Sequence, residues 1–360
     1  MKTARALALM ALPAFLVLSL GPSGSVAAGS TRPPLCATFS IVARDTATGE
    51  FGVAVQSHWF AVGTTVPWAE AGVGAVATQS FVEPAYGPHL LARMRAGESA
   101  TSALTREIDA DSQRATRQVI VIDARGNSGA QTGEACVPYA GHHVARDHVC
   151  AGNLLAADGV WDRMSEAFDA TPGPLGDRLL AALEAGQKAG GDSRGMQSAA
   201  MIVVRAVDPD RPWKNRVVDL RVDDSPAPIE ELRRLYTMNQ AYTFANQGDE
   251  AFARKDYASA LRLYDAGVQL APANDEILFW RGSMKMGIGD AAGAASDCAA
   301  AIRMNPRWKV LIARIPATFF PGVDTVCSRL SIQRTSVPRV AATRKCHLYC
   351  YARMSSLLSS

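Results

Sequence analysis

Thr38 is the residue best placed for nucleophilic chemistry, because it opens an alternating apolar run close to the N-terminus. A threonine at a free N-terminus can use its own α-amine as the base that activates its hydroxyl. The chemistry that this favours is attack on a carbonyl carbon, as in amide hydrolysis. Cys36 is a rival nucleophile, although a cysteine in an exported chain is more often part of a disulfide.

Ser57, His58 and Asn153 are the polar residues expected nearest to Thr38. Two alternating runs, 38–44 and 51–57, flank a Gly-containing turn, which predicts a β-hairpin. Antiparallel pairing places the end of the second strand beside the start of the first. Donors at these strand ends could orient the amine or stabilise an oxyanion. The alternative for each is an ordinary polar residue at the end of a strand.

Five further residues are candidates for binding substrate: Trp59, Gln79, Glu83, Asp192 and Arg194. Trp59 would line a pocket wall, whereas Gln79 and Glu83 follow a strand of small residues. Asp192 and Arg194 belong to a Gly-rich loop, in which they could hold an ammonium and a carboxylate. This loop lacks the Lys-Ser/Thr ending of a phosphate-binding loop. A plain turn with a local ion pair is the alternative.

The order of elements predicts the fold of the first domain, 36–225. Strands are expected at 38–44, 51–57, 72–80, 117–123, 128–132, 143–154, 198–206 and 217–222, and helices near 86–97, 99–109, 159–169 and 176–189. Adjacent hairpins imply antiparallel sheets, and strands apolar on both faces need cover on both sides. We therefore expect an α/β (α+β) fold, a four-layer α-β-β-α sandwich of two stacked sheets between two helical layers.

The N-terminus has the pattern of a secretory signal at residues 1–28. Lys2 and Arg5 precede an apolar run, and Val26-Ala27-Ala28 offers a small-residue cleavage site. The protein is therefore expected to be exported, periplasmic or secreted. The alternative is an uncleaved membrane anchor.

An exported chain can form disulfides. Cys136 and Cys150 could pair with each other, or one of them with Cys36. Cys298 occupies a helix-packing position and is expected to be a core thiol.

A repeat follows the first domain. After a linker and capping helix, 226–240, small or aromatic residues and a proline recur at the 34-residue spacing of tetratricopeptide repeats, for example Ala260 and Ala294. We predict a small all-α domain of two repeats plus a cap at 241–330. The tail, 331–360, is basic and patternless, which predicts disorder. Its Cys-His-Leu-Tyr-Cys run is a weak metal motif, so no metal site is expected.

Several blocks of the first domain closely resemble one bacterial family. They are Thr-Phe-Ser-Ile-Val-Ala-Arg-Asp at 38–45, Gly-Val-Ala-Val-Gln-Ser-His-Trp-Phe at 52–60, Tyr-Gly-Pro at 86–88 and Gly-Asp-Ser-Arg-Gly-Met-Gln-Ser at 191–198. The family is domain of unknown function 1028, which is similar to the N-terminal-nucleophile hydrolases. The resemblance implies the four-layer fold, a nucleophile at Thr38 and hydrolysis of C–N bonds. Residues 29–37 precede Thr38 here, so its amine becomes free only if they are removed.

Two functions follow from the sequence. The first is an exported amidohydrolase with an N-terminal threonine nucleophile, which acts without a cofactor on a small amide or peptide-like substrate. The second is a non-catalytic envelope or periplasmic binding protein that holds a protein partner through residues 241–330. The net charge of +3 and the absence of a basic stripe argue against nucleic acid. No membrane association is expected after signal cleavage, and a homodimer is left open.

Overall fold

The computed structural model describes residues 35–36 and 38–335. The predicted signal segment and most of the tail lie outside these residues. The strands are β1 (Leu35–Cys36), β2 (Thr38–Asp45), β3 (Glu50–Ser57), β4 (Pro67–Glu70), β5 (Gly74–Phe81), β6 (Arg117–Asp123), β7 (Ser128–Thr132), β8 (Gly141–Val144), β9 (His148–Asn153), β10 (Ser198–Val204) and β11 (Arg216–Val222). The helices are α1 (Tyr86–Arg95), α2 (Ala100–Ala110), α3 (Val160–Ala170), α4 (Leu175–Lys188), α5 (Pro228–Ala253), α6 (Tyr257–Leu270), α7 (Asp275–Gly287), α8 (Ala291–Met304), α9 (Arg307–Ile312) and α10 (Val323–Arg329).

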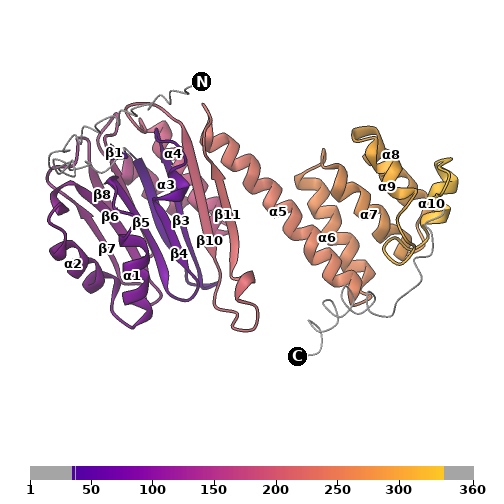
Figure 1. Cartoon of the computed structure of the whole chain (residues 1–360), viewed down its shortest axis with the longest axis horizontal. Coiled ribbons are helices and arrows are strands. Elements are labelled where there is room, and N and C mark those ends of the chain that lie inside the picture. The colour runs from indigo at the N-terminus through magenta and orange to yellow at the C-terminus, as the bar shows by residue number, and fades with distance from the viewer. Residues whose placement is uncertain (1–34, 37, 336–360) are drawn as a thin grey trace, which may run out of the picture.

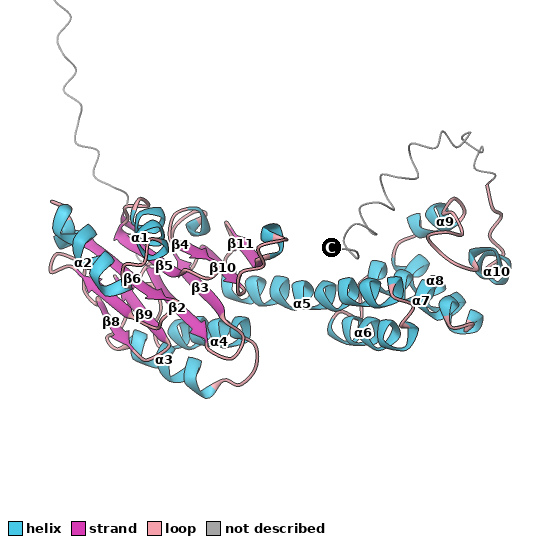
Figure 2. Cartoon of the chain, turned by 90° about the horizontal axis from the view of Figure 1, so that it is seen from below, coloured by secondary structure: helices cyan, strands magenta, loops and turns pink. Residues whose placement is uncertain are grey.

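Two antiparallel sheets form the first domain (Figure 1). One has the order β1-β5-β6-β7, with β4 also paired to β5, and the other has the order β11-β10-β3-β2-β9-β8. Helices α3 and α4 cover the second sheet, and α1 and α2 cover the first (Figure 2). The predicted four-layer α-β-β-α sandwich is therefore confirmed.

The alternation along each strand distributes its side chains between two cores. On β2, Phe39 and Ile41 pack toward α3 and α4, whereas Val42 packs between the sheets. Successive side chains of a strand point to opposite faces. The layer between the sheets is therefore built from every second residue of the strands that face each other.

One prediction about the strands was wrong, and one strand was missed. Residues 143–154 form two strands, β8 and β9, which a turn separates where the N–H of Ala145 donates to the carbonyl of His148. Strand β4 was not predicted, since it is short and begins with Pro67. It pairs with the edge of β5, where proline costs little because one strand edge needs no donor.

The pairing of Cys136 with Cys150, which the sequence left open as one alternative, is contradicted by the structure. Both are buried free thiols, as are Cys298 and Cys327. Burial raises the pKa of the Cys150 thiol well above its ordinary value, which keeps it protonated and unreactive. The side chain of Cys36 lies outside the described residues.

The C-terminal helices pair as tetratricopeptide repeats do, α5 with α6 and α7 with α8. Small residues lie where two helices touch. A Cβ atom on Gly248 would approach the ring of Tyr264 to 2.6 Å, and one on Gly282 would lie 3.1 Å from the sulfur of Cys298. The buried Cys298 is thus a core thiol, as predicted. Helices α9 and α10 add Ile312, Val323 and Val326 to the core of the second repeat.

Helix α5 belongs to both domains. Its first half packs on the sandwich through Ile229, Leu232 and Tyr236, and its second half supplies Ala241 and Ala245 to the first repeat. The helix between the domains and the first helix of the repeat are thus one continuous element (Figure 2). Among the described residues, no helix combines the length and the apolar character that crossing a membrane requires.

Candidate functional site

One end of the layer between the sheets is polar. Thr38, Ser57 and Asn153 come from three adjacent strands of the second sheet, and the pairing places Thr38 opposite both Ser57 and Asn153. All three side chains are buried. The hydroxyl of Thr38 donates to Oγ of Ser57 over 3.1 Å. The structure therefore brings these three predicted residues together.

The other sheet contributes two glutamines to the same place. Gln79 on β5 accepts from the hydroxyl of Ser40 at 2.7 Å, and its amide nitrogen lies 3.4 Å from the carbonyl oxygen of Thr38. Oε1 of Gln118 on β6 accepts from Nε2 of Gln79 at 2.7 Å and from Nδ2 of Asn153 at 2.9 Å. Two sheets are thus joined by side-chain amides beside Thr38.

Gln118 and Ser40 were not predicted as site residues. Both lie inside strands that read as ordinary alternating runs, and only the stacking of β6 over β9 and of β5 over β2 aligns them with Thr38. The signal that could have found them is positional. Thr38, Ser40, Gln79 and Gln118 all hold inward-facing places near the same ends of their strands.

Asp192 and Arg194 border the polar end from the loop before β10. The buried carboxylate of Asp192 accepts from the backbone N–H of His58 at 2.8 Å and pairs with Arg194 at 3.0 Å. It therefore fixes the backbone that follows Ser57. The His58 ring is hydrogen bonded with the carbonyl of Met196 and lines a separate cleft of about 310 Å³. The backbone of His58, rather than its imidazole, is what Asp192 holds beside Ser57.

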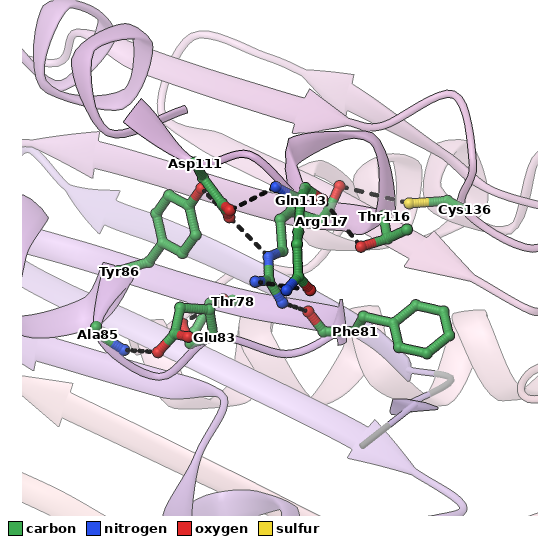
Figure 3. A network of polar contacts seen from close by, with 10 residues as sticks. All are labelled: Thr78, Phe81, Glu83, Ala85, Tyr86, Asp111, Gln113, Thr116, Arg117 and Cys136. Atoms are coloured by element: carbon green, nitrogen blue, oxygen red, sulfur yellow. Dashed lines mark hydrogen bonds and ion pairs between the residues drawn. The ribbon is translucent and has the colours of Figure 1, made fainter. Parts of the chain in front are cut away.

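Trp59 and Glu83 do not join this cluster. Trp59 is half-buried, and its carbonyl accepts from Ser198. Glu83 accepts from the N–H of Ala85 at the start of α1, and its own carbonyl accepts from Thr78 (Figure 3). Glu83 is therefore part of the turn into α1 on the outer side of the sheet.

A buried arginine fixes the end of β5 after Gln79. Arg117 pairs with Asp111 at 2.7 Å and donates to the carbonyl of Phe81, while the hydroxyl of Tyr86 donates to Asp111 (Figure 3). Burial and the hydrogen bond to Asp111 raise the pKa of Tyr86. Burial would raise the pKa of Asp111, but hydrogen bonds from Arg117, Gln113 and Tyr86 lower it. This network holds β5 against β6 beside the two glutamines.

The backbone changes sheets immediately before Thr38. Cys36 pairs with Ser80 of β5 in the first sheet, whereas Thr38 already belongs to the second sheet. Cys36 and Thr38, two residues apart in the chain, therefore belong to different sheets. Thr38 is fully buried in this form of the protein.

A metal centre has no support in this part of the chain. Within residues 35–36 and 38–335, no group of three or more His, Cys, Asp or Glu side chains is placed to hold a metal ion. What the cluster offers is neutral hydroxyl and amide groups, which suit the donation of hydrogen bonds to a carbonyl oxygen.

The fold and the polar end define a class of protein, an antiparallel α-β-β-α sandwich with a hydroxyl residue opening a central strand, joined to helical repeats. The chain belongs to the family described as "Family of unknown function (DUF1028)", whose model matches residues 38–232. A crystal structure of a family member from Silicibacter pomeroyi is 36% identical, with a TM-score of 0.51, and the match covers 56% of this chain and 84% of that one.

The helical part has relatives of its own. It is similar to a tetratricopeptide domain of Spaghetti bound to an HSP90 peptide, at 20% identity and a TM-score of 0.23 over 26% of this chain and 71% of that one. A STIP1 homolog of Dictyostelium discoideum is 33% identical over 69 residues. That match spans 19% of this chain and only 12% of the relative.

Proposed function

We propose that the sandwich domain is an amide hydrolase that becomes competent when the residues before Thr38 are removed. One observation carries this proposal: hydroxyl and amide side chains from both sheets converge on Thr38 at one end of an otherwise apolar layer. Burying polar groups costs free energy unless they are hydrogen bonded, and apolar packing of the kind found in the rest of this layer avoids that cost. The position of Thr38 at the first residue of β2 is the second support.

The proposed reaction uses the new α-amine of Thr38 as the base. The amine takes the hydroxyl proton while Oγ1 attacks the substrate carbonyl, and the proton then passes to the leaving amine as the C–N bond breaks. Water hydrolyses the resulting ester and restores the hydroxyl. The products are one carboxylic acid and one amine.

The neighbours of Thr38 have distinct parts in this proposal. Ser57 lies close enough to orient the amine or the hydroxyl, since its Oγ is 3.1 Å from Oγ1 of Thr38. Nδ2 of Asn153 and Nε2 of Gln79 are the amide donors suited to a developing oxyanion. Both now donate to Gln118, which holds them in place. Asp192 acts through the backbone after Ser57 and is a positioning residue.

Export belongs to the same proposal. A signal at 1–28 would leave residues 29–37 in front of Thr38, so a second cleavage between Ala37 and Thr38 is required. The intact mass of the exported protein measures this directly.

The test compares three forms of the protein: one that begins at Thr38, one that begins at Gly29, and the first with its amine acetylated. Each is offered a panel of acyl and aminoacyl anilides, and release of the aniline is followed by absorbance. We expect turnover only from the form with a free Thr38 amine. Equal turnover by all three forms would exclude the α-amine as base, and no turnover of any amide by the first form would exclude the function.

Partner binding through the repeats is a second proposed function. It is supported by Val310 and Leu311 on α9 and by Phe319 in the turn that follows α9, which are 51%, 40% and 63% exposed. Large exposed apolar side chains that gather on one segment are typical of interaction surfaces. Replacing these three residues by serine should abolish capture of a partner by the full chain and leave amide hydrolysis unchanged. Capture that survives this substitution would contradict the role of this surface.

A further inference from the structure

A cleft of about 640 Å³ opens beside the polar end of the sandwich. It lies between the segment that joins β7 to β8 and the start of α3, and its walls include Thr132, Tyr139, His142, Asp158 and Trp161. Its size is that of a pocket for a small organic molecule.

One side chain connects this cleft to the candidate nucleophile. Nε2 of Gln118 donates to Oγ1 of Thr132 at 2.9 Å and to the carbonyl of Gly141 at 3.1 Å, and both acceptors line the cleft. Oε1 of the same glutamine holds Asn153 and Gln79 beside Thr38. Gln118 therefore contacts the cleft wall through Nε2 and the Thr38 cluster through Oε1.

The charged side chains that line the cleft are acidic. Its lining includes the carboxylates of Glu134 and Asp158, both exposed, and no lysine or arginine. Partial burial lowers the pKa of His142, so its ring is neutral at pH 7 and does not compensate them. Neither carboxylate forms an ion pair within the described residues, which leaves both available to a ligand.

Aromatic surface accompanies these charges. Tyr139 is 50% exposed at the cleft, and the ring of Trp161 packs so closely on Gly141 that a Cβ there would lie 2.4 Å from it. Glycine is required at 141 for this contact, which fixes the indole in the wall. Carboxylates together with tyrosine and tryptophan faces favour a cation carried on an apolar stem.

The cleft at the opposite end of the sandwich has a different lining. It has a volume of about 590 Å³, and Arg95, Arg125 and Arg216 face it together with Glu70 and Asp123. The cleft at the end away from Thr38 therefore does not share the purely acidic lining of the cleft beside Thr132.

We propose that the cleft beside Thr132 and Trp161 binds the cationic group of the amide substrate, an alkylammonium or guanidinium on an apolar chain. This inference rests on the proposed function for treating the ligand as a substrate. The recognition itself depends only on the cleft. Glu134 and Asp158 bind the charge, and Tyr139 and Trp161 pack on the stem.

The test measures equilibrium binding by calorimetry to the full exported chain and to the form that begins at Thr38. The probes are benzoyl-arginine amide and benzoyl-citrulline amide, which have nearly the same shape and differ in charge. We expect the arginine compound to bind about tenfold more tightly, since two exposed charge pairs are each worth up to about 1 kcal/mol. The double variant Glu134→Gln/Asp158→Asn should lose this preference.

Two further variants control the result. Asp109→Asn removes an exposed carboxylate on α2 that does not line the cleft, and it should leave the preference for the arginine compound unchanged. Tyr139→Leu keeps apolar bulk without the aromatic face and should weaken the arginine compound about threefold. Equal affinity for the two probes, no binding of the arginine compound to either form, or an unchanged preference in the double variant would overturn the proposal.

The same measurement separates this inference from the hydrolase proposal. The Thr38→Ala variant should bind the arginine compound as the parent does, because Thr38 does not line the cleft. A preference for the cation without cleavage of any amide would leave the cleft assignment standing and reject the hydrolase. Cleavage of amides with no preference for cations would leave the hydrolase proposal standing and reject the cleft assignment.

Discussion

The two ends of the layer between the sheets are built by the same alternation of residues but serve different purposes. At one end Val53, Ile120 and Ile122 fill the layer with apolar side chains. At the other end the same strands present Ser57 and Gln118 in equivalent inward places. The apolar end stabilises the stacking of the sheets. The polar end depends on hydrogen bonds between its groups, which makes its geometry specific, and only Oδ1 of Asn153 in the Thr38 cluster has no partner within the described residues.

Loss of the nucleophile should give the largest effect at the polar end. In the form that begins at residue 38, Thr38→Ala should lower kcat/KM on the order of a thousandfold, or about 4 kcal/mol, because no other hydroxyl there has an α-amine as base. Thr38→Ser should retain turnover. Chemical denaturation should show both variants folded, and an alanine variant as active as the parent would contradict the proposed role.

A cavity at the apolar end should instead reduce stability. Ile120 is 1% exposed between the sheets, so Ile120→Ala should lower the free energy of unfolding by about 3 kcal/mol. Urea unfolding at 25 °C measures this loss. Per folded molecule, anilide turnover should be close to that of the parent. A large loss of turnover in fully folded protein would show that the two ends are not separable.

Gln118 tests whether the polar network is held by its central acceptor. Gln118→Leu leaves the amides of Gln79 and Asn153 without that acceptor, which should cost about 1–3 kcal/mol of stability. Gln131→Leu on β7 is the control, because Gln131 is half-exposed and should change stability by less than about 0.5 kcal/mol. Equal effects of the two substitutions would argue against a network at this place.

Asp123, at the far end of β6, gives the smallest expected effect and a pH signature. Burial would raise its pKa, but hydrogen bonds from Ala100, Asn127 and Arg125 outweigh burial and lower it. A carboxyl whose folded pKa is depressed stabilises the protein above its unfolded pKa of about 3.9, and this stability is lost as the pH falls further.

Asp123→Asn should therefore cost about 1–2 kcal/mol at pH 7, and this cost should shrink as the pH falls below about 3.9 through the depressed pKa of the folded protein. Denaturation at several pH values measures the difference between the two proteins. A constant difference across this range would contradict an ionised carboxylate in this role.

The sequence predicted the fold better than the site, for a physical reason. Hairpin signals and strands that are apolar on both faces can be recognised in short stretches of sequence, and together they predict the four-layer arrangement. The split of 143–154 into β8 and β9 was missed, because the turn at Ala145 contains neither glycine nor proline. The short edge strand β4 has too few residues to show a period.

Site residues were found where strand ends determine position. Thr38, Ser57, Gln79 and Asn153 all lie within one polar cluster. Glu83 was placed near them by sequence distance, yet the turn into α1 takes it to the outer face. The position of Gln118 near a strand end was the one signal for it in the sequence, and its role depends in addition on which strand of the second sheet lies beneath β6.

Helix α5 has a consequence for how the protein unfolds. It carries residues of the sandwich core and of the first repeat on one unbroken helix, and the family model ends inside it, at residue 232. When either domain melts, one half of α5 loses the core against which it packs. The other domain depends on the same helix and is destabilised with it. The two domains should therefore lose their structure in a single cooperative transition, even though they differ in fold and in relatives.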